Sequence, residues 1–202
     1  MNCQKLLEAK LKELACADKK PRLLLHACCA PCSSYVVEYL SEYFEPTLFY
    51  YNPNIYPEDE YNKRALQFEK LLSEAARGTG LIISDYTPSA FADAIKSLEN
   101  EPEGGARCAA CFRLRLEQSA HYARAHGYDC FTTTLSVSPH KNSALLNEIG
   151  GDLAQKHGID FLFSDFKKKD GYKRSLILSA EYGLYRQDYC GCKYSVRPHD
   201  EA

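Results

Sequence analysis

Short apolar runs alternate with amphipathic segments along most of the chain, and this alternation constrains the fold more than any other feature of the sequence. Strands that alternate with helices form right-handed crossover units, so we expect an α/β fold whose mostly parallel sheet has helices on both faces. The apolar runs predict strands at 23–27, 47–52, 81–86, 130–137 and 159–166. The amphipathic segments predict helices at 33–44, 60–78, 91–99, 108–127 and 144–158, with Pro46 ending the first, and one more helix in the remainder of the chain.

The length of 202 residues suffices for a single α/β domain over 1–202. A charged amphipathic segment predicts an N-terminal helical extension at 1–21, followed by the main body of the domain at 22–195. The extension lacks the uninterrupted apolar core of a secretory signal, and no later stretch approaches the roughly 18 apolar residues of a membrane span. We therefore expect a soluble, cytoplasmic protein with no membrane partner.

Seven of the ten cysteines fall into three tight groups, which are Cys28/Cys29/Cys32, Cys108/Cys111 and Cys190/Cys192. In a reducing compartment, clustered cysteines indicate metal binding or redox chemistry more often than structural disulfides. The first group directly follows the strand at 23–27, at the sheet edge where parallel α/β folds bind ligands. We therefore expect metal centres at the carboxyl end of the first strand. The isolated Cys3, Cys16 and Cys130 are expected to be structural.

The adjacent Cys28 and Cys29 are the most unusual part of this pattern. A disulfide between neighbours is strained, and in an extended backbone the two side chains point to opposite sides, which suits two sites placed side by side. Four thiolates fill an iron–sulfur cluster or a structural zinc site, and three cysteines remain for a second metal. We expect a 4Fe-4S cluster with an adjacent metal centre. Zinc remains an alternative, as does dithiol exchange with a disulfide bond formed by Cys108 and Cys111.

Three cysteine-bearing segments together resemble the QueH-type epoxyqueuosine reductases: HACCAPCS at 26–33, the helix that begins with Cys108-x-x-Cys111, and YRQDYCGC at 185–192. The segments 52–57, 132–142 and 171–175 fit the same family, so the resemblance runs from about residue 23 to residue 195. It implies a Rossmann-like fold of the nucleotide-hydrolase type and a tRNA substrate. The implied reaction is the last step of queuosine synthesis, in which the epoxide on the modified wobble guanosine is reduced to an alkene.

The resemblance also implies a 4Fe-4S cluster beside a further iron ion, without cobalamin. Its implied metal ligands are Cys28, Cys29, Cys32, Cys108, Cys111, Cys190 and Cys192. The reduction consumes two electrons, so an external electron donor must reload the cluster, and an adjacent iron would act as a Lewis acid on the epoxide oxygen. Asp188, Tyr189 and His26 flank the cysteine groups and are the candidate proton donors, although His26 fits a structural role equally well.

The net charge of −2 requires any RNA contact to use a local basic patch. The two candidate patches are Lys167, Lys168, Lys169, Lys173 and Arg174, and Arg107, Arg113 and Arg115. The aromatic candidates for stacking on bases are Phe49, Tyr50, Tyr51, Tyr56 and Tyr61, of which strand alternation places about half in the core. His140 is expected in a loop near the substrate.

Two other functions remain open from the residues alone. A nucleotide-dependent tRNA-modifying enzyme of the same broad fold, such as a sulfur-transfer ligase, usually has a Ser-Gly-Gly-x-Asp-Ser phosphate loop after its first strand. Here that place holds HACCAPC, which gives ATP chemistry little support. A zinc-stabilised RNA-binding module without catalysis would be colourless and would need no reductant.

Overall fold

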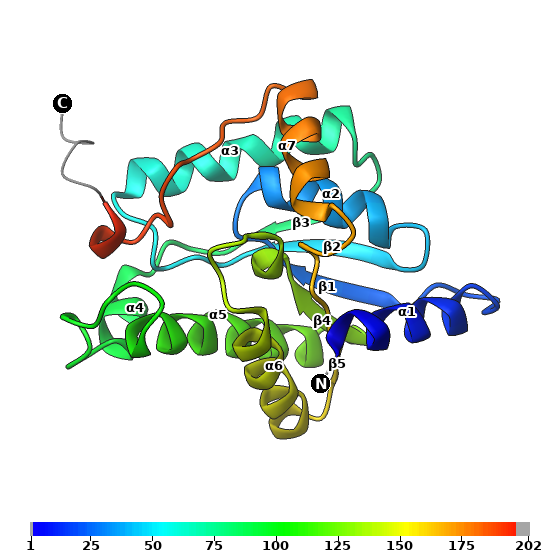
Figure 1. Cartoon of the computed structure of the whole chain (residues 1–202), viewed down its shortest axis with the longest axis horizontal. Helices are drawn as coiled ribbons and strands as arrows, with labels where there is room; N and C mark the ends of the chain where they lie inside the picture. The colour runs from blue at the N-terminus through cyan, green and yellow to red at the C-terminus, as the bar shows by residue number, and fades with distance from the viewer. Residues whose placement is uncertain (1, 197–202) are drawn as a thin grey trace.

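The computed structural model describes residues 2–196 and contains a five-stranded sheet whose strands are all parallel (Figure 1). The α/β class and the parallel sheet expected from the sequence are confirmed. The strand order is β3-β2-β1-β4-β5, so the chain starts in the middle of the sheet and winds outward twice. The order reverses at β1, which is the position where such sheets bind their ligands. The strands are β1 (Arg22–His26), β2 (Glu45–Tyr50), β3 (Gly80–Ile83), β4 (Cys130–Thr133) and β5 (Asp160–Phe161).

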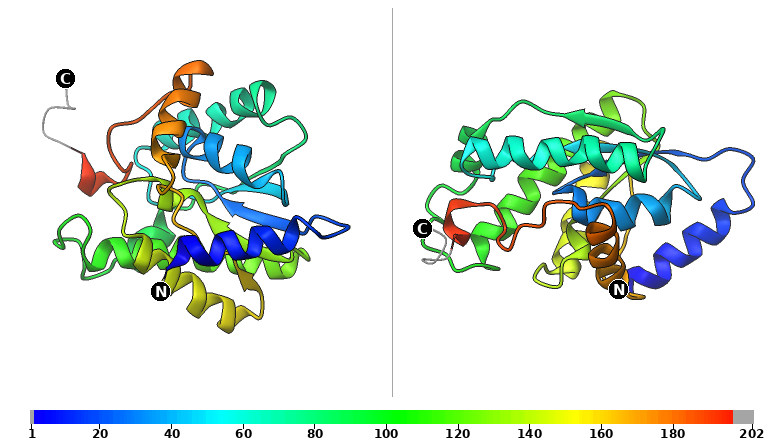
Figure 2. Two further views of the ribbon diagram at one scale, coloured as in Figure 1. Left: turned by 45° about the vertical axis from the view of Figure 1, so that its right-hand side comes forward. Right: turned by 90° about the horizontal axis from the view of Figure 1, so that it is seen from above.

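Helices cover both faces of this sheet, with α2, α3 and α7 on one side and α5 and α6 on the other (Figures 1 and 2). The alternation of side chains along β1 explains this arrangement, because Leu23 and Leu25 face the first group while Leu24 faces the second. The helices are α1 (Cys3–Leu14), α2 (Ala30–Leu40), α3 (Glu58–Glu74), α4 (Pro88–Ala94), α5 (Ala106–Ala125), α6 (Ser143–His157) and α7 (Gly171–Glu181).

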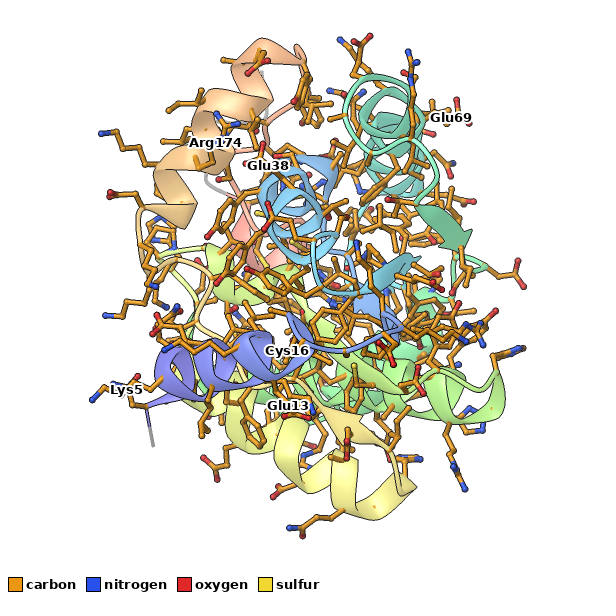
Figure 3. All side chains as sticks on the ribbon, turned by 90° about the vertical axis from the view of Figure 1, so that its right-hand side faces the viewer. Lys5, Glu13, Cys16, Glu38, Glu69 and Arg174 are labelled. Carbon is orange, nitrogen blue, oxygen red and sulfur yellow. The ribbon has the colours of Figure 1, made fainter. Side chains whose placement is uncertain are left out.

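The N-terminal helix α1 packs onto the main core. Leu7 and Leu11 are buried in the same apolar cluster as Phe44 and Phe166. Figure 3 shows the neighbouring side of the molecule, where Arg174 of α7 and Glu38 of α2 face each other in an ion pair of 2.7 Å. None of the helices in the part of the chain that the structure describes is long and apolar enough to cross a lipid bilayer.

Three expected strands are shorter than the sequence indicated, and the one expected at 81–86 spans only 80–83. The strand at 130–137 ends at Thr133, and residues 134–137 form a 3-10 helix instead. Thr133 causes this change because its hydroxyl accepts a hydrogen bond from the backbone N–H of Leu135 at 3.1 Å. The strand at 159–166 is confined to 160–161. The backbone N–H of Ser164 instead donates to the Asn147 side chain at 2.8 Å.

The expected end of the helix at 33–44 is also displaced. Helix α2 ends at Leu40, and Pro46 lies inside β2 rather than at a helix end. Proline is tolerated there because the pairing of β2 with β3 begins one residue later, at Thr47. These differences concern element ends and leave the order of strands and helices as expected.

Candidate metal centre

The three cysteines that follow β1 form a compact cluster. Their Sγ atoms all lie within 4.8 Å of one another, and the Sγ atoms of Cys28 and Cys29 are 3.7 Å apart. The expectation that the adjacent side chains face apart was wrong. The strand has already ended at His26 and the chain bends at Cys28 before α2 begins at Ala30, so the alternation of side chains along a strand does not apply to Cys28 and Cys29.

The protonation of these three thiols is uneven. Hydrogen bonds from the thiols of Cys29 and Cys32 hold the pKa of Cys28 well below its ordinary value, and the charge of Arg115 adds to the effect. Cys29, hydrogen-bonded to the Cys28 sulfur, has its pKa raised to about 12, and the pKa of Cys32 is raised for the same reason. One thiolate beside two thiols suits a metal site, because the thiolate is the ligand form and a bound metal displaces the remaining protons.

Of the four cysteines in the other two groups, only Cys190 lines a cavity together with Cys28 and Cys32. Cys111 of α5 and Cys192 of the C-terminal segment are buried together in one apolar cluster. Burial raises the pKa of Cys111 to about 11, and the charges of Arg115 and Cys190 also act on its thiol. Cys108 lies one turn earlier on α5, where its Sγ accepts a hydrogen bond from the backbone N–H of Gly104 at 3.2 Å.

A cavity of about 660 Å³ connects the first and third cysteine groups, because Cys28, Cys32 and Cys190 all line it. Its walls contain buried polar atoms that have no hydrogen-bond partner among the described residues. Asn54, Arg64 and Arg115 are each only 2% exposed. An unpaired buried polar group costs about 1–3 kcal/mol, so this wall is built for a polar ligand. The unpartnered atoms are Asn54 Oδ1, Arg64 Nη2, Arg115 Nε and Gln187 Oε1.

Two of the cations that line this cavity, Lys141 and Arg115, have no carboxylate partner in the part of the chain that the structure describes. Lys141 Nζ donates to the Sγ of Cys190 at 3.3 Å, and Arg115 donates to the side chain of Asn52. Buried cations need compensating negative charge. Thiolates that hold a metal carry such charge, so the residues present fit an anionic metal–thiolate group.

The candidate proton donors fall into two environments. Asp188 is exposed and Tyr189 half-buried, and both line the cavity. Burial raises the pKa of Tyr189, whose ring lies 5.1 Å from the guanidinium carbon of Arg64. His26 is completely buried and lies outside the residues that line the cavity.

Both ring nitrogens of His26 are used inside the protein. Nε2 donates to the carbonyl of Tyr51 at 3.2 Å, and Nδ1 accepts from the hydroxyl of Thr133 at 2.8 Å. Burial lowers the pKa of His26 to about 3, so the ring is neutral. This geometry fits the structural role, in which His26 joins the carboxyl ends of β1, β2 and β4.

Three of the five cations in the first basic patch, at 167–169 and 173–174, form ion pairs with acidic side chains. Lys169 pairs with Glu8 at 2.6 Å and Lys167 with Asp165 at 3.4 Å, and Arg174 is held by Glu38. Lys168 and Lys173 are exposed.

The second basic patch was a wrong expectation. Arg107 and Arg115 are buried, and Arg113 pairs with Asp152 at 3.0 Å. Of the five aromatic candidates, only Tyr56 is exposed, at 55%, and Phe49, Tyr50, Tyr51 and Tyr61 belong to the core. His140 is exposed and lines the cavity, as expected.

All ten cysteines are free thiols and lie within the described residues, so the disulfide bond of the dithiol-exchange alternative is not present. Cys16 is exposed and Cys130 is buried.

Sequence reasoning missed several residues of the site, including Asn54, Arg64 and Lys141. Asn54 and Lys141 lie in the loops that follow β2 and β4, and polar residues after the strands of a parallel sheet are a usable signal. No sequence signal indicated Arg64, because it lies on α3 among charged residues and only the fold shows that it is buried.

The fold and the site define a doubly wound α/β protein with a cysteine-rich candidate metal centre at the point where the strand order reverses. Comparison with known proteins identifies the family. The model of the family described as "Epoxyqueuosine reductase QueH" matches residues 23–198. The chain belongs to this family.

Curated relatives named "Epoxyqueuosine reductase QueH" align with nearly the whole chain. Those from Streptococcus pyogenes serotype M1 and Staphylococcus epidermidis are each 40% identical to it, over 98% and 97% of this chain and 79% and 85% of the relatives. A more distant relative from Thermotoga maritima is 35% identical over 86% of this chain and 90% of its own length. The first of these alignments leaves little of the chain uncovered, so it includes most of α1, which the family match omits.

Proposed function

We propose that this chain is an epoxyqueuosine reductase that reduces epoxyqueuosine at the wobble position of tRNA to queuosine, independently of cobalamin, with electrons delivered through an iron–sulfur cluster. Family membership supports the activity. The observation that carries the proposal is the clustering of three cysteine sulfurs within 4.8 Å at the wall of a cavity with unpartnered buried polar atoms. We place the reaction in the cytoplasm.

The cofactors proposed are a 4Fe-4S cluster and an adjacent iron ion. When bound, they supply electrons singly and a Lewis acid for the epoxide oxygen. The residues that would hold them are the seven clustered cysteines, Cys28, Cys29, Cys32, Cys108, Cys111, Cys190 and Cys192. An external electron donor returns the electrons.

The chain's own residues bind and orient the substrate. Asn54 offers a hydrogen-bond acceptor and Arg64 a donor, and both are buried in the cavity wall without protein partners for these atoms. Arg64 also donates to the backbone carbonyl of Cys190 at 3.2 Å and to Glu60 at 2.7 Å. It therefore fixes the C-terminal cysteine segment beside α3 while a second amino group remains free for the ligand.

The reduction also needs protons. Two electrons and two protons convert the epoxide to an alkene and water, with both bonds from carbon to oxygen broken. Asp188 and Tyr189 line the cavity and are the proposed donors. Tyr189 is protonated at neutral pH like any tyrosine, and burial raises its pKa further. We retain His26 only as a positioning residue, since both of its nitrogens are occupied.

Binding of tRNA is proposed at exposed lysines near α7. Lys168 and Lys173 are exposed, whereas their neighbours Lys167, Lys169 and Arg174 are paired with acids. We expect Lys168→Ala/Lys173→Ala to weaken tRNA binding and to flatten its salt dependence, because each phosphate contact contributes to the slope. Unchanged binding over a salt series would move the RNA site elsewhere.

The test of the function is anaerobic purification, with iron and acid-labile sulfide counted on the sample that is then given epoxyqueuosine-containing tRNA and a chemical reductant. We expect a brown protein with more iron than one cluster requires, and formation of queuosine. A colourless protein that holds zinc without sulfide would overturn the proposal and favour the zinc-stabilised RNA-binding module.

A further inference from the structure

We propose that Arg115 is a positioning residue whose buried positive charge sets the reduction potential of the metal–thiolate centre. This inference rests on the proposed function. Arg115 is 2% exposed and lines the same cavity as Cys28 and Cys190. It lies on α5 four residues after Cys111, so the two side chains share one face of the helix.

A short chain of hydrogen bonds fixes the guanidinium relative to the first cysteine group. Arg115 Nη2 donates to Asn52 Oδ1, and Asn52 Nδ2 donates to the carbonyl of Ala27 at 2.9 Å. Ala27 directly precedes Cys28. The Asn52 side chain thus ties α5, which carries Cys108 and Cys111, to the turn that carries the first cysteine group.

The guanidinium is not satisfied by the protein around it. Its Nε is buried and has no hydrogen-bond partner, and no carboxylate pairs with it among the described residues. A buried cation of this kind calls for an anion in the space that it faces. The cysteines provide that anion when they hold a metal as thiolates.

The consequence for the reaction is electrostatic. A reduced cluster carries one more negative charge than an oxidised one, so a fixed neighbouring cation stabilises the reduced state more strongly. Lys141 contributes in the same sense at Cys190, but its ammonium is held by a flexible stem, whereas the planar guanidinium of Arg115 is fixed. Arg115 therefore makes the centre easier to reduce by its donor.

The experiment is a redox titration of the anaerobically purified protein, followed by electron paramagnetic resonance, after iron and sulfide have been counted. Arg115→Met removes the charge at similar side-chain length, and Arg115→Lys retains it. Arg113→Met is the matched control, since Arg113 lies two residues earlier on the same helix with its side chain on the surface. We expect the equilibrium constant for reduction to fall at least about tenfold in Arg115→Met, which for one electron is about 59 mV more negative. The reduction potential of Arg115→Lys should lie closer to that of the unaltered protein, and the potential of Arg113→Met should equal that of the unaltered protein.

An Arg115→Met protein that keeps its cluster and the original potential would overturn the inference. If Arg115→Met holds no cluster, the potential of Asn52→Leu tests the inference instead. This variant keeps the charge of Arg115 and removes the hydrogen bond that fixes its guanidinium. A more negative potential in Asn52→Leu supports the inference, and an unchanged potential overturns it. An unaltered protein without any cluster would instead refute the proposed function, so the two failures are distinguishable.

Discussion

The carboxyl and amino edges of the sheet each carry a cavity lined by at least one cysteine, yet they differ in what surrounds that cysteine. The cavity at the carboxyl edge contains buried polar atoms without partners, on Asn54, Arg64 and Arg115. The cavity at the amino edge, of about 300 Å³, lies beside α1 and has a largely apolar wall that includes Cys130. Its polar groups are used locally, since Asp129 accepts a hydrogen bond from the backbone N–H of Arg22 at 2.7 Å.

The pKa values of half-buried Cys28 and buried Cys130 are shifted in opposite directions by these surroundings. Burial, reinforced by the charges of Asp129 and Asp160, raises the pKa of Cys130 to about 12. At the other edge, hydrogen bonds from neighbouring thiols and the charge of Arg115 lower the pKa of Cys28. Burial alone therefore does not indicate a functional cysteine. The pKa of a cysteine is lowered only where hydrogen-bond donors and positive charge surround its sulfur, as at Cys28 at the edge where the strand order reverses.

The largest expected effect comes from exchanging a cysteine at each edge. We expect Cys28→Ala to lose bound iron and all detectable reduction of epoxyqueuosine in tRNA, because the change removes a proposed ligand and the only thiol of its trio with a lowered pKa. Cys130→Ala is the matched control and should keep both iron content and turnover. Iron analysis and a turnover assay on the two variants check this, and loss of iron in both would erase the distinction between the edges.

Asp188→Asn tests whether the exposed acid at the carboxyl-edge cavity delivers a proton. We expect turnover to fall on the order of 100-fold, the usual size of a general-acid contribution, while iron and sulfide content stay unchanged. Tyr189→Phe is the companion variant for the other candidate. Full turnover in Asp188→Asn would assign the proton to Tyr189 or to water.

Asn54→Leu tests the unpartnered acceptor in the cavity wall. Because Oδ1 of Asn54 is buried without a partner, an apolar replacement of similar size should leave the protein as stable as before or slightly more stable. Binding of the substrate should weaken about tenfold, seen as a higher KM with little change in kcat. Urea denaturation and steady-state kinetics on one preparation separate the two effects, and a loss of stability without a change in KM would make Asn54 structural.

The sequence predicted the order of strands and helices because hydrophobic periodicity depends on local residues. It also placed Cys28, Cys29 and Cys32 correctly at the end of β1. It could not predict that the sulfurs of Cys28 and Cys29 lie 3.7 Å apart, because their direction depends on where the strand ends and α2 begins.

The sequence also could not predict which charged residues are buried. Arg107 and Arg115 have the pattern of a basic surface in the sequence, and only the packing of α5 against its neighbours shows that both are inside. The same holds for Arg64 on α3, because its part in the site depends on its contact with the C-terminal segment, where it donates to the carbonyl of Cys190. Residues that act through contacts distant in sequence leave no local signal.

The smallest expected effect concerns the amino edge and its dependence on pH. A thiol whose pKa is raised to about 12 in the folded protein, from near 9 when unfolded, keeps its proton in the native state while the unfolded chain loses it. Its contribution to stability is therefore complete below pH 9 and is lost as the pH rises toward 12, by up to about 1.4 kcal/mol per pH unit. The charges of Asp129 and Asp160 act in the same direction, and that of Lys10 opposes them. The Cys130→Ala variant should lose stability less steeply than the unaltered protein over this range, in urea denaturation measured at several pH values. Parallel curves would mean that the amino-edge cavity admits water and that the contrast with the carboxyl edge is smaller than the structure indicates.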